Sequence, residues 1–406
     1  MSPSEPPDDP PNDRPAAVVA TPVQSDTSLP PVATVTALRA CARNVELSLS
    51  TEQASFTFGA AGPPEVDLTL EGEGISRLHA IFQRRGPKLR ILDQRSTNGT
   101  YYRDRRDMDF EIAAGDVFEV THKRIRIIAL DESLRLLRPR LQWAMGLRAH
   151  AAVDQALEDA ASGAPLLLVG PRHCEQRALA EEIHRRSAYR HRDFVASPFR
   201  FETPAEYETK LEHAERSSLY LDLTDADPGE VEMPGRFVAR LFGGTIRPIV
   251  VARDQEQAQR LLGADALGLR AIRLPPLDSR REEIPRLLDA LLLQAGHGPD
   301  GLLPLDALGE ANVGALKAYA WTNNFDDVRR IVPRLHSLLT NGLGLRASAR
   351  AYGCSLGAQR DALKRLGIRV TGADDDSGDD DDREALGRDE PPADDGPVMP
   401  LDPPTE

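Results

Sequence analysis

The sequence predicts a multidomain chain in which an all-β sandwich precedes an α/β domain with a parallel sheet, followed by short helices and an acidic tail. Between residues 35 and 130, short strand-like runs alternate with Gly, Pro and Asp, which is typical of a β-sandwich. After residue 135, buried strand-like runs alternate with helical stretches, which indicates a parallel sheet. From residue 371 onward the composition becomes acidic and Pro-rich, as in disordered tails.

The predicted boundaries follow these changes in composition. Residues 140–163 and 280–340 are expected to be helical throughout, and residues 345–368 are expected to form two short helices around a turn. In chain order, the predicted parts are a disordered Pro/Asp-rich segment (1–34), the β-sandwich (35–133), the α/β domain (136–293), a helical lid (294–341), the helix pair (342–370) and a disordered acidic tail (371–406).

The negative charge of the chain is concentrated at its two ends. The formal net charge is −14 over 406 residues; residues 371–406 contribute −12 and residues 1–33 contribute −4, which leaves the middle at +2. The overall acidity therefore does not exclude an anionic partner for the folded part.

Cysteine usage and hydropathy bear on the expected location of the protein. Cys41, Cys174 and Cys354 are far apart and fit neither a disulfide framework nor a metal-binding spacing. The first residues lack the basic and apolar regions of a signal peptide, and no apolar run approaches the ~20 residues that span a bilayer. We expect a soluble, cytoplasmic protein with no bound metal and no membrane partner.

Two short segments of the sandwich carry groups suited to a phosphate. GISRLHA (74–80) contains Ser-Arg, and DQRSTNGTYY (93–102) contains Thr-Asn-Gly, so hydroxyl, guanidinium and amide donors are expected at one end of the fold. With FTFG (56–59) as the opening strand, about 90 residues resemble the forkhead-associated (FHA) domain. That resemblance implies a phosphothreonine-containing protein as partner.

The resemblance assigns roles residue by residue. Ser76 and Arg77 would contact the phosphothreonine, Thr97 and Asn98 would hold the peptide backbone, His79 would brace the loop, and Gly59 and Gly99 would have structural roles, the latter permitting a turn. In the family an arginine follows the first glycine, whereas Gly59 is followed here by Ala60. Losing that charge-assisted contact would cost ~1.5–3 kcal/mol. The alternative is a sandwich that binds an unphosphorylated partner.

The segment 166–187 has the layout of a phosphate loop, with a buried strand, an eight-residue turn and a helix. SLYLDLTDAD (218–227) has the layout of an acidic strand end. Together with RLPPLDSRREEIPRLLDALL (273–292) and LKAYAWTNNFDDVRRIV (316–332), these segments resemble the AAA+ domain of sigma-54-dependent transcriptional activators. The resemblance covers roughly residues 140–340.

The residues that the AAA+ chemistry needs are replaced here. Laid over the family's phosphate loop, Gly170 is retained, but Gln176 stands at the lysine position and Glu175 at a glycine position. Asp222 remains on the acidic strand, but Leu223 stands where the family has a second acid. The lid arginine position is occupied by Asp326. We therefore expect a degenerate nucleotide site, no ATPase activity and no cofactor, with ATP binding doubtful.

Two further features concern partners. The family's loop for contacting the sigma factor is absent between the phosphate loop and the acidic strand, so that contact is not predicted. Residues 346–368 resemble the helix-turn-helix that ends many such activators, which implies DNA contacts by Arg360, Lys364 and Arg365. The alternative is a basic surface helix pair with no role in DNA binding.

These observations favour a regulator that recognises a phosphothreonine peptide, carries an inactive AAA+ domain and binds DNA. One alternative is an adaptor in a Ser/Thr kinase pathway that does not bind DNA. A second is an ATP-binding, sigma-54-dependent activator.

Overall fold

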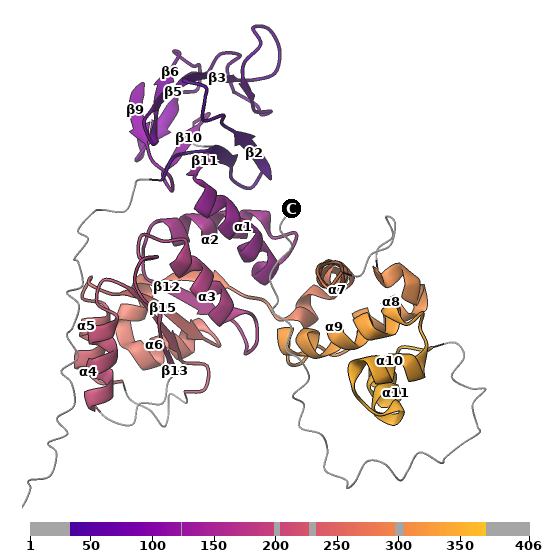
Figure 1. Cartoon of the computed structure of the whole chain (residues 1–406). Coiled ribbons are helices and arrows are strands. Elements are labelled where there is room, and N and C mark those ends of the chain that lie inside the picture. Colours follow the sequence, from indigo (N-terminus) through magenta and orange to yellow (C-terminus); the bar gives the residue numbers. More distant parts are fainter. Residues whose placement is uncertain (1–32, 123, 199–203, 227–232, 297–303, 371–406) are drawn as a thin grey trace, which may run out of the picture. The chain divides into compact units, whose positions relative to one another are not determined.

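The computed structural model describes residues 33–122, 124–198, 204–226, 233–296 and 304–370 (Figure 1). The predicted acidic tail lies outside the described residues. So does the predicted N-terminal disordered segment, apart from its last two residues.

The first described part is a sandwich of two sheets, in which all strand pairs except β3 with β4 are antiparallel. One sheet has the strand order β2-β1-β11-β10-β7-β8 and the other has the order β4-β3-β5-β6-β9. The strands are β1 (Ala37–Ala40), β2 (Val45–Ser48), β3 (Ser55–Gly59), β4 (Leu68–Thr69), β5 (Ala80–Arg85), β6 (Lys88–Asp93), β7 (Thr100–Tyr102), β8 (Arg105–Arg106), β9 (Asp109–Ile112), β10 (Val117–Val120) and β11 (Ile125–Leu130).

Alternating aromatic residues build the core between the two sheets. Phe58 of β3 stacks on Phe82 of β5 with ring centroids 5.2 Å apart, and Phe82 meets Phe118 of β10 edge to face at 6.1 Å. All three rings are buried, while their neighbours along each strand, apart from Gly59, are only half-buried. The period-two pattern of the sequence therefore gives each sheet one face toward the core.

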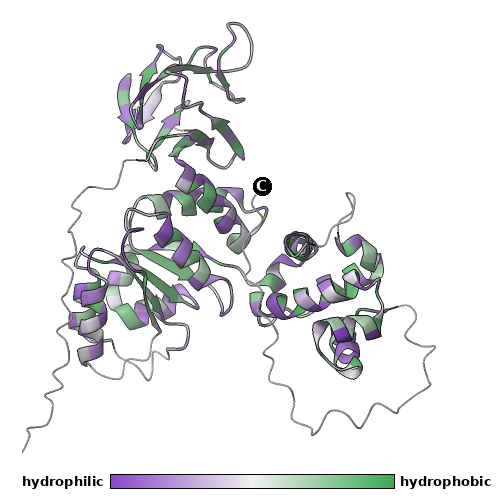
Figure 2. Cartoon of the chain, in the orientation of Figure 1, coloured by the Kyte–Doolittle hydropathy of each residue, from purple (hydrophilic) through white to green (hydrophobic). Residues whose placement is uncertain are grey.

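A parallel sheet follows, with strand order β13-β14-β15-β12-β16. Its strands are β12 (Leu166–Val169), β13 (Val195–Pro198), β14 (Ser218–Asp222), β15 (Arg247–Ala252) and β16 (Arg270–Arg273). Every residue of β12 and β15 is buried, as expected for central strands covered on both faces. Figure 2 shows the hydrophobic colouring along these strands.

Helices flank this sheet, and the first of them begins directly after the sandwich. The Asp131 carboxylate accepts a hydrogen bond from the Leu134 amide at 2.8 Å, which caps the helix only one residue after β11. Residues 140–163 were expected to be one continuous helical stretch, but the chain breaks at Gly146, whose φ of 129° is not helical. The helices are α1 (Glu132–Met145), α2 (His150–Ala161), α3 (Gln176–Arg185), α4 (Pro204–His213), α5 (Gly235–Leu241) and α6 (Gln255–Leu262).

The last described part is helical. Its hydrophobic core surrounds Trp321, which is fully buried and donates its indole N–H to the Leu316 carbonyl at 3.0 Å. The expectation of helix throughout 280–340 is wrong in detail, because turns and 3-10 segments separate the helices. The elements are η2 (Leu277–Glu283), α7 (Ile284–Gln294), η3 (Pro304–Leu308), α8 (Glu310–Ala318), α9 (Phe325–Thr340), α10 (Leu345–Tyr352) and α11 (Leu356–Arg365).

The predicted order of a β-sandwich, an α/β domain with a parallel sheet, and helices is confirmed. None of the helices among the described residues has the length and apolar character needed to cross a membrane.

Candidate functional site

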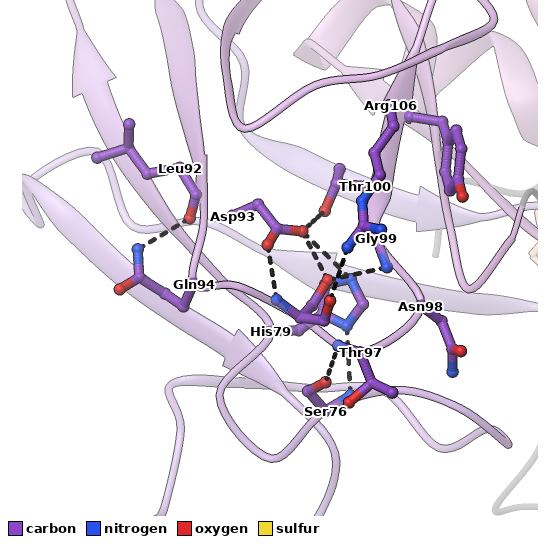
Figure 3. Close-up of polar contacts among 12 residues, drawn as sticks. Ser76, His79, Leu92, Asp93, Gln94, Thr97, Asn98, Gly99, Thr100 and Arg106 are labelled. Atoms are coloured by element: carbon purple, nitrogen blue, oxygen red, sulfur yellow. Dashed lines mark hydrogen bonds and ion pairs between the residues drawn. The ribbon is translucent and has the colours of Figure 1, made fainter.

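Two loops of the sandwich are tied together by the predicted site residues (Figure 3). The Ser76 hydroxyl oxygen accepts a hydrogen bond from the Thr97 amide at 3.1 Å, and the Asn98 side-chain amide donates to the Gly74 carbonyl at 2.8 Å. The Ala60 amide donates to the Ser76 carbonyl at 3.0 Å. The structure therefore brings Ser76, Thr97 and Asn98 together, with Ala60 directly beside them.

His79 supports this arrangement from within the fold. Its side chain is fully buried, packs edge to face on Phe58 at 5.9 Å, and accepts a hydrogen bond from the Ser76 amide at Nδ1, 3.3 Å away. Burial lowers the pKa of His79, so the ring is neutral at neutral pH and its proton lies on Nε2. The predicted bracing position of His79 agrees with these contacts.

A buried carboxylate that the sequence analysis did not single out organises the second loop. Asp93 ends β6 and accepts hydrogen bonds from the Ser96 amide at 2.7 Å, the Ser96 hydroxyl at 2.6 Å and the Thr100 hydroxyl at 2.7 Å. Burial alone would raise the pKa of Asp93, but these hydrogen bonds outweigh burial and lower it. The Ser96 hydroxyl oxygen in turn accepts from the Gly99 amide at 3.1 Å.

The backbone geometry at Gly59 and at Gly99 favours glycine for two different reasons. A Cβ atom on Gly59 would lie 1.9 Å from the Arg77 carbonyl oxygen, so only glycine allows β3 to approach that loop so closely. Gly99 has a φ of 76°, in the region that favours glycine, and it turns the chain into β7.

The loop surface has groups left to bind a ligand. Arg77 and Thr97 are exposed, and no described residue pairs with the Arg77 guanidinium. A guanidinium beside hydroxyl and amide groups suits a phosphate attached to an extended peptide. Ala60 contributes no charge at this edge. Arg77 is the cation of the first loop, while Arg106 donates to the Ser96 carbonyl of the second loop at 3.0 Å.

The phosphate-loop segment (residues 170–177) is filled by its own side chains. Gln176 Oε1 accepts the Cys174 amide at 2.9 Å, and Gln176 Nε2 donates to the carbonyls of Pro171 and, at 3.4 Å, Gly170. A backbone N–H that would face a phosphate in a working loop is therefore already bound. The Gln176 side chain therefore folds back onto the backbone of its own loop.

Asp222 lines the same cavity as Gln176, and its carboxylate oxygens also accept hydrogen bonds from nearby residues. Its carboxylate accepts the Thr224 amide at 3.0 Å, the Thr224 hydroxyl at 2.7 Å and the Tyr220 hydroxyl at 3.2 Å. The cavity has a volume of about 470 Å³ and is lined by His173, Glu175, Gln176, Arg177, Ala178, Glu181, Ala196, Tyr220, Asp222 and Arg329. In the part of the chain that the structure describes, no group of three or more His, Cys, Asp or Glu side chains is arranged to hold a metal ion.

The last two helices place the predicted basic residues on their outer face. Arg360, Lys364 and Arg365 of α11 are exposed, whereas Leu363 packs in the core. Ser355 caps α11 by accepting the Ala358 amide at 3.1 Å. The pair therefore has a helix, a tight turn and a second helix with a basic outer surface.

Comparisons with known proteins bear on the sandwich most directly. The FHA domain model matches residues 56–121, the segment that contains both loops of the sandwich described above. Residues 56–121 form an FHA domain. A comparison with curated proteins finds no match.

Two kinds of solved structure resemble the chain, namely FHA domains and NtrX from Brucella abortus. An FHA domain from a study of phosphothreonine-dependent FHA interactions is 24% identical, covering 23% of this chain and 93% of its own, with a TM-score of 0.21. The FHA domain of CT664 from Chlamydia trachomatis is 23% identical, with coverages of 23% and 95% and a TM-score of 0.21. NtrX from Brucella abortus, in complex with ATP, is 21% identical, with coverages of 58% and 67% and a TM-score of 0.34.

The loop residues that the structure brings together were visible in the sequence, whereas the buried carboxylate of Asp93 was not. The motif residues stood out because they lie in two short polar loops. Asp93 could have been found from its position three residues before Ser96, a spacing typical of an Asp side chain that bonds to the backbone of its own turn. No local signal pointed to Arg140 and Arg329, which form ion pairs with Glu175, because they lie 35 and 154 residues away in the sequence.

Proposed function

We propose that the chain is a signalling regulator that recognises a phosphothreonine-containing peptide through the loops carrying Ser76 and Thr97. The observation that supports this most is the 3.1 Å bond between the Ser76 hydroxyl oxygen and the Thr97 amide, with Arg77 exposed beside it in an FHA domain. One of the similar FHA structures comes from work on phosphothreonine-dependent interactions.

The chemistry assigns each group a part. The Arg77 guanidinium and the Ser76 hydroxyl bind the dianionic phosphate, and charge-assisted hydrogen bonds of this kind are the strong ones. Thr97 and Asn98 hold the peptide backbone on either side. Asn98 also donates to the Gly74 carbonyl, so its amide ties the first loop to the second.

The test is binding of the full chain to a degenerate phosphothreonine peptide library and to its unphosphorylated counterpart. We expect binding that needs the phosphate and falls at least tenfold in Asn98→Ala and Arg77→Ala. Lys88→Ala is the matched control, because Lys88 is exposed and lies at the other end of β6, one strand length away from the loops. Equal binding of both libraries would overturn the proposal.

We further propose that the α/β domain does not hydrolyse ATP. The support is that Gln176 stands at the lysine position with its amide bonded inside the loop, while Glu175 stands at a glycine position. The expected outcome is no ATP turnover by the full chain beyond that of a no-protein control. Turnover that Asp222→Ala abolishes would contradict this.

DNA binding is a second candidate function, supported by the exposed Arg360, Lys364 and Arg365 on the capped helix α11. Each lost phosphate contact should reduce the slope of log affinity against log salt by about one. A titration of duplex DNA with the full chain, compared with Arg360→Ala and Lys364→Ala, tests it. A phosphopeptide partner without any DNA affinity would instead favour the adaptor.

A further inference from the structure

A cluster of charged side chains fastens helix α9 to the phosphate-loop segment. At its centre is Glu175, whose side chain is 1% exposed and which pairs with Arg140 of α1 at 3.2 Å and with Arg329 of α9. Arg329 also pairs with Asp326 at 2.7 Å, and Asp326 meets His173 Nδ1 at 2.9 Å. The cluster therefore joins three segments that are distant in the sequence.

Neutral hydrogen bonds run beside the charged ones. The Phe325 amide donates to the His173 carbonyl at 3.0 Å, and the Asn324 side-chain amide donates to the Arg172 carbonyl at 2.9 Å. Asn324 is buried and accepts the Leu277 amide at 3.0 Å. The first turn of α9 is thus bonded to consecutive residues of the loop that would otherwise surround a phosphate.

The charged groups of the cluster are paired with one another. Burial raises the pKa of Glu175, and the guanidiniums of Arg329 and Arg140 oppose that effect. The formal charges of Glu175, Asp326, Arg140 and Arg329 cancel. A polyphosphate would meet the Glu175 carboxylate at the position where a working loop offers backbone N–H groups and a lysine.

We propose that Glu175 and Gln176 take the place of a bound phosphate, so that α9 is held against the loop without nucleotide. The Glu175 carboxylate supplies the negative charge that the α9 arginine binds, and the Gln176 amide saturates the loop backbone. The lid is consequently fixed in one position, and the α/β domain serves as a rigid support instead of a nucleotide-driven switch. This inference rests on the proposed lack of ATP hydrolysis.

Hydrogen exchange of the full chain tests whether the charged cluster holds α9 against the phosphate-loop segment. We expect Glu175→Gln and Arg329→Gln each to raise amide exchange in the first turns of α9 at least tenfold, and the double variant to be no worse than either single one. Arg177→Ala is the control: it removes an exposed arginine that lines the same cavity but pairs with Glu181. Unchanged exchange of β12 in every variant shows that the fold is intact.

The outcomes separate this inference from the proposed function. Unchanged α9 exchange in Glu175→Gln would overturn the inference and leave phosphopeptide recognition and the lack of turnover standing. Protection of α9 by ATP in the unmodified chain would also overturn it.

A second variant tests the phosphate-mimic idea by gain of function. Glu175→Gly with Gln176→Lys returns two family residues to the loop, and glycine suits the φ of 65° at position 175. We expect a fluorescent ATP analogue to bind this variant at least tenfold more tightly than the unmodified chain. Equal affinity would show that the two side chains do not exclude the phosphate.

Discussion

The FHA loops and the phosphate-loop segment each have a buried carboxylate beside a tight turn. The two regions differ in where the partners of that carboxylate come from. In the FHA domain, Asp93 is satisfied by Ser96 and Thr100 of its own loop, which leaves Ser76 and Arg77 facing outward. In the phosphate-loop segment, Glu175 is satisfied by arginines from other elements.

The difference shows how a loop keeps or loses a ligand site. Where the scaffold satisfies the buried charge locally, the donors of the loop remain for a ligand. Where the charges are satisfied across elements, the same bonds fill the site and lock its surroundings. Gln176 completes that contrast, because it binds the loop backbone that a phosphate would need.

The largest effect should come from removing the local acceptor of the FHA loop. Asp93→Ala leaves the Ser96 and Thr100 groups without their partner, and we expect the local free energy of opening to fall by about 3 kcal/mol or more. Hydrogen exchange of β6 and β7 in the full chain measures this. Asp109→Ala is the control, because that carboxylate is exposed at the surface, and its removal should leave exchange nearly unchanged. Similar effects of both variants would contradict the role of Asp93.

The second largest effect should be an increase in affinity for the phosphopeptide. Ala60 lies beside Ser76 and lacks the charge that the FHA family carries there, so Ala60→Arg should tighten phosphopeptide binding by about tenfold or more. Calorimetry with a peptide selected from the library measures it. Ala54→Arg adds the same charge before the far end of β3 and should not tighten binding comparably. If both variants bind the peptide equally more tightly, the added affinity comes from the extra positive charge in general and not from a restored contact.

Acid should weaken peptide binding through His79. Its pKa is lowered by burial, so the folded domain keeps the ring neutral, whereas the unfolded chain takes up a proton below about pH 6.5. The stability contributed by the neutral ring is therefore complete above that pH and is lost as the pH falls through the folded-state pKa. Protonation also removes the acceptor for the Ser76 amide.

Peptide affinity measured from pH 7.5 to pH 5 should show this loss on top of the titration of the phosphate itself, which has a pKa near 6. His79→Asn keeps an acceptor that does not titrate and should show the phosphate titration alone. Identical profiles for the two proteins would exclude a contribution from His79.

Much of the fold was predictable because the spacing of apolar residues and the positions of Gly, Pro and Asp are local features of the sequence. The order of sandwich, parallel sheet and helices follows from strand length and from buried runs such as 166–169. The break at Gly146 was missed because a single glycine within an otherwise helical pattern does not reveal its φ.

The candidate sites were predictable only where their residues are neighbours in sequence. The FHA loop residues are supplied by two short segments, so their motifs were visible. Glu175 was recognised at a glycine position of the phosphate loop, but its partners Arg140 and Arg329 lie 35 and 154 residues away. Nothing local specifies such pairings.

Gln359 provides the smallest and most discriminating test. It stands where the helix-turn-helix resemblance has a core leucine, and it is fully buried with partners on both sides: its amide donates to the Ser348 hydroxyl at 2.8 Å, and its oxygen accepts from Arg334 at 3.0 Å. Gln359→Leu should lower the free energy of unfolding of the helical part by only about 1 kcal/mol, because added apolar burial offsets part of the loss of hydrogen bonds.

Denaturant unfolding followed by tryptophan fluorescence measures this change, because Trp143 and Trp321 both lie in the hydrophobic core of the helical part. Combining Gln359→Leu with Ser348→Ala should recover part of it, since the hydroxyl would no longer be left buried without its partner. If the free energy of unfolding falls by much more than this and the double variant recovers none of it, the hydrogen bonds of Gln359 fix the position of α11. In that event the buried glutamine, like Glu175, would be holding elements together across the fold, and the contrast with the self-contained FHA loop would extend to the whole helical part.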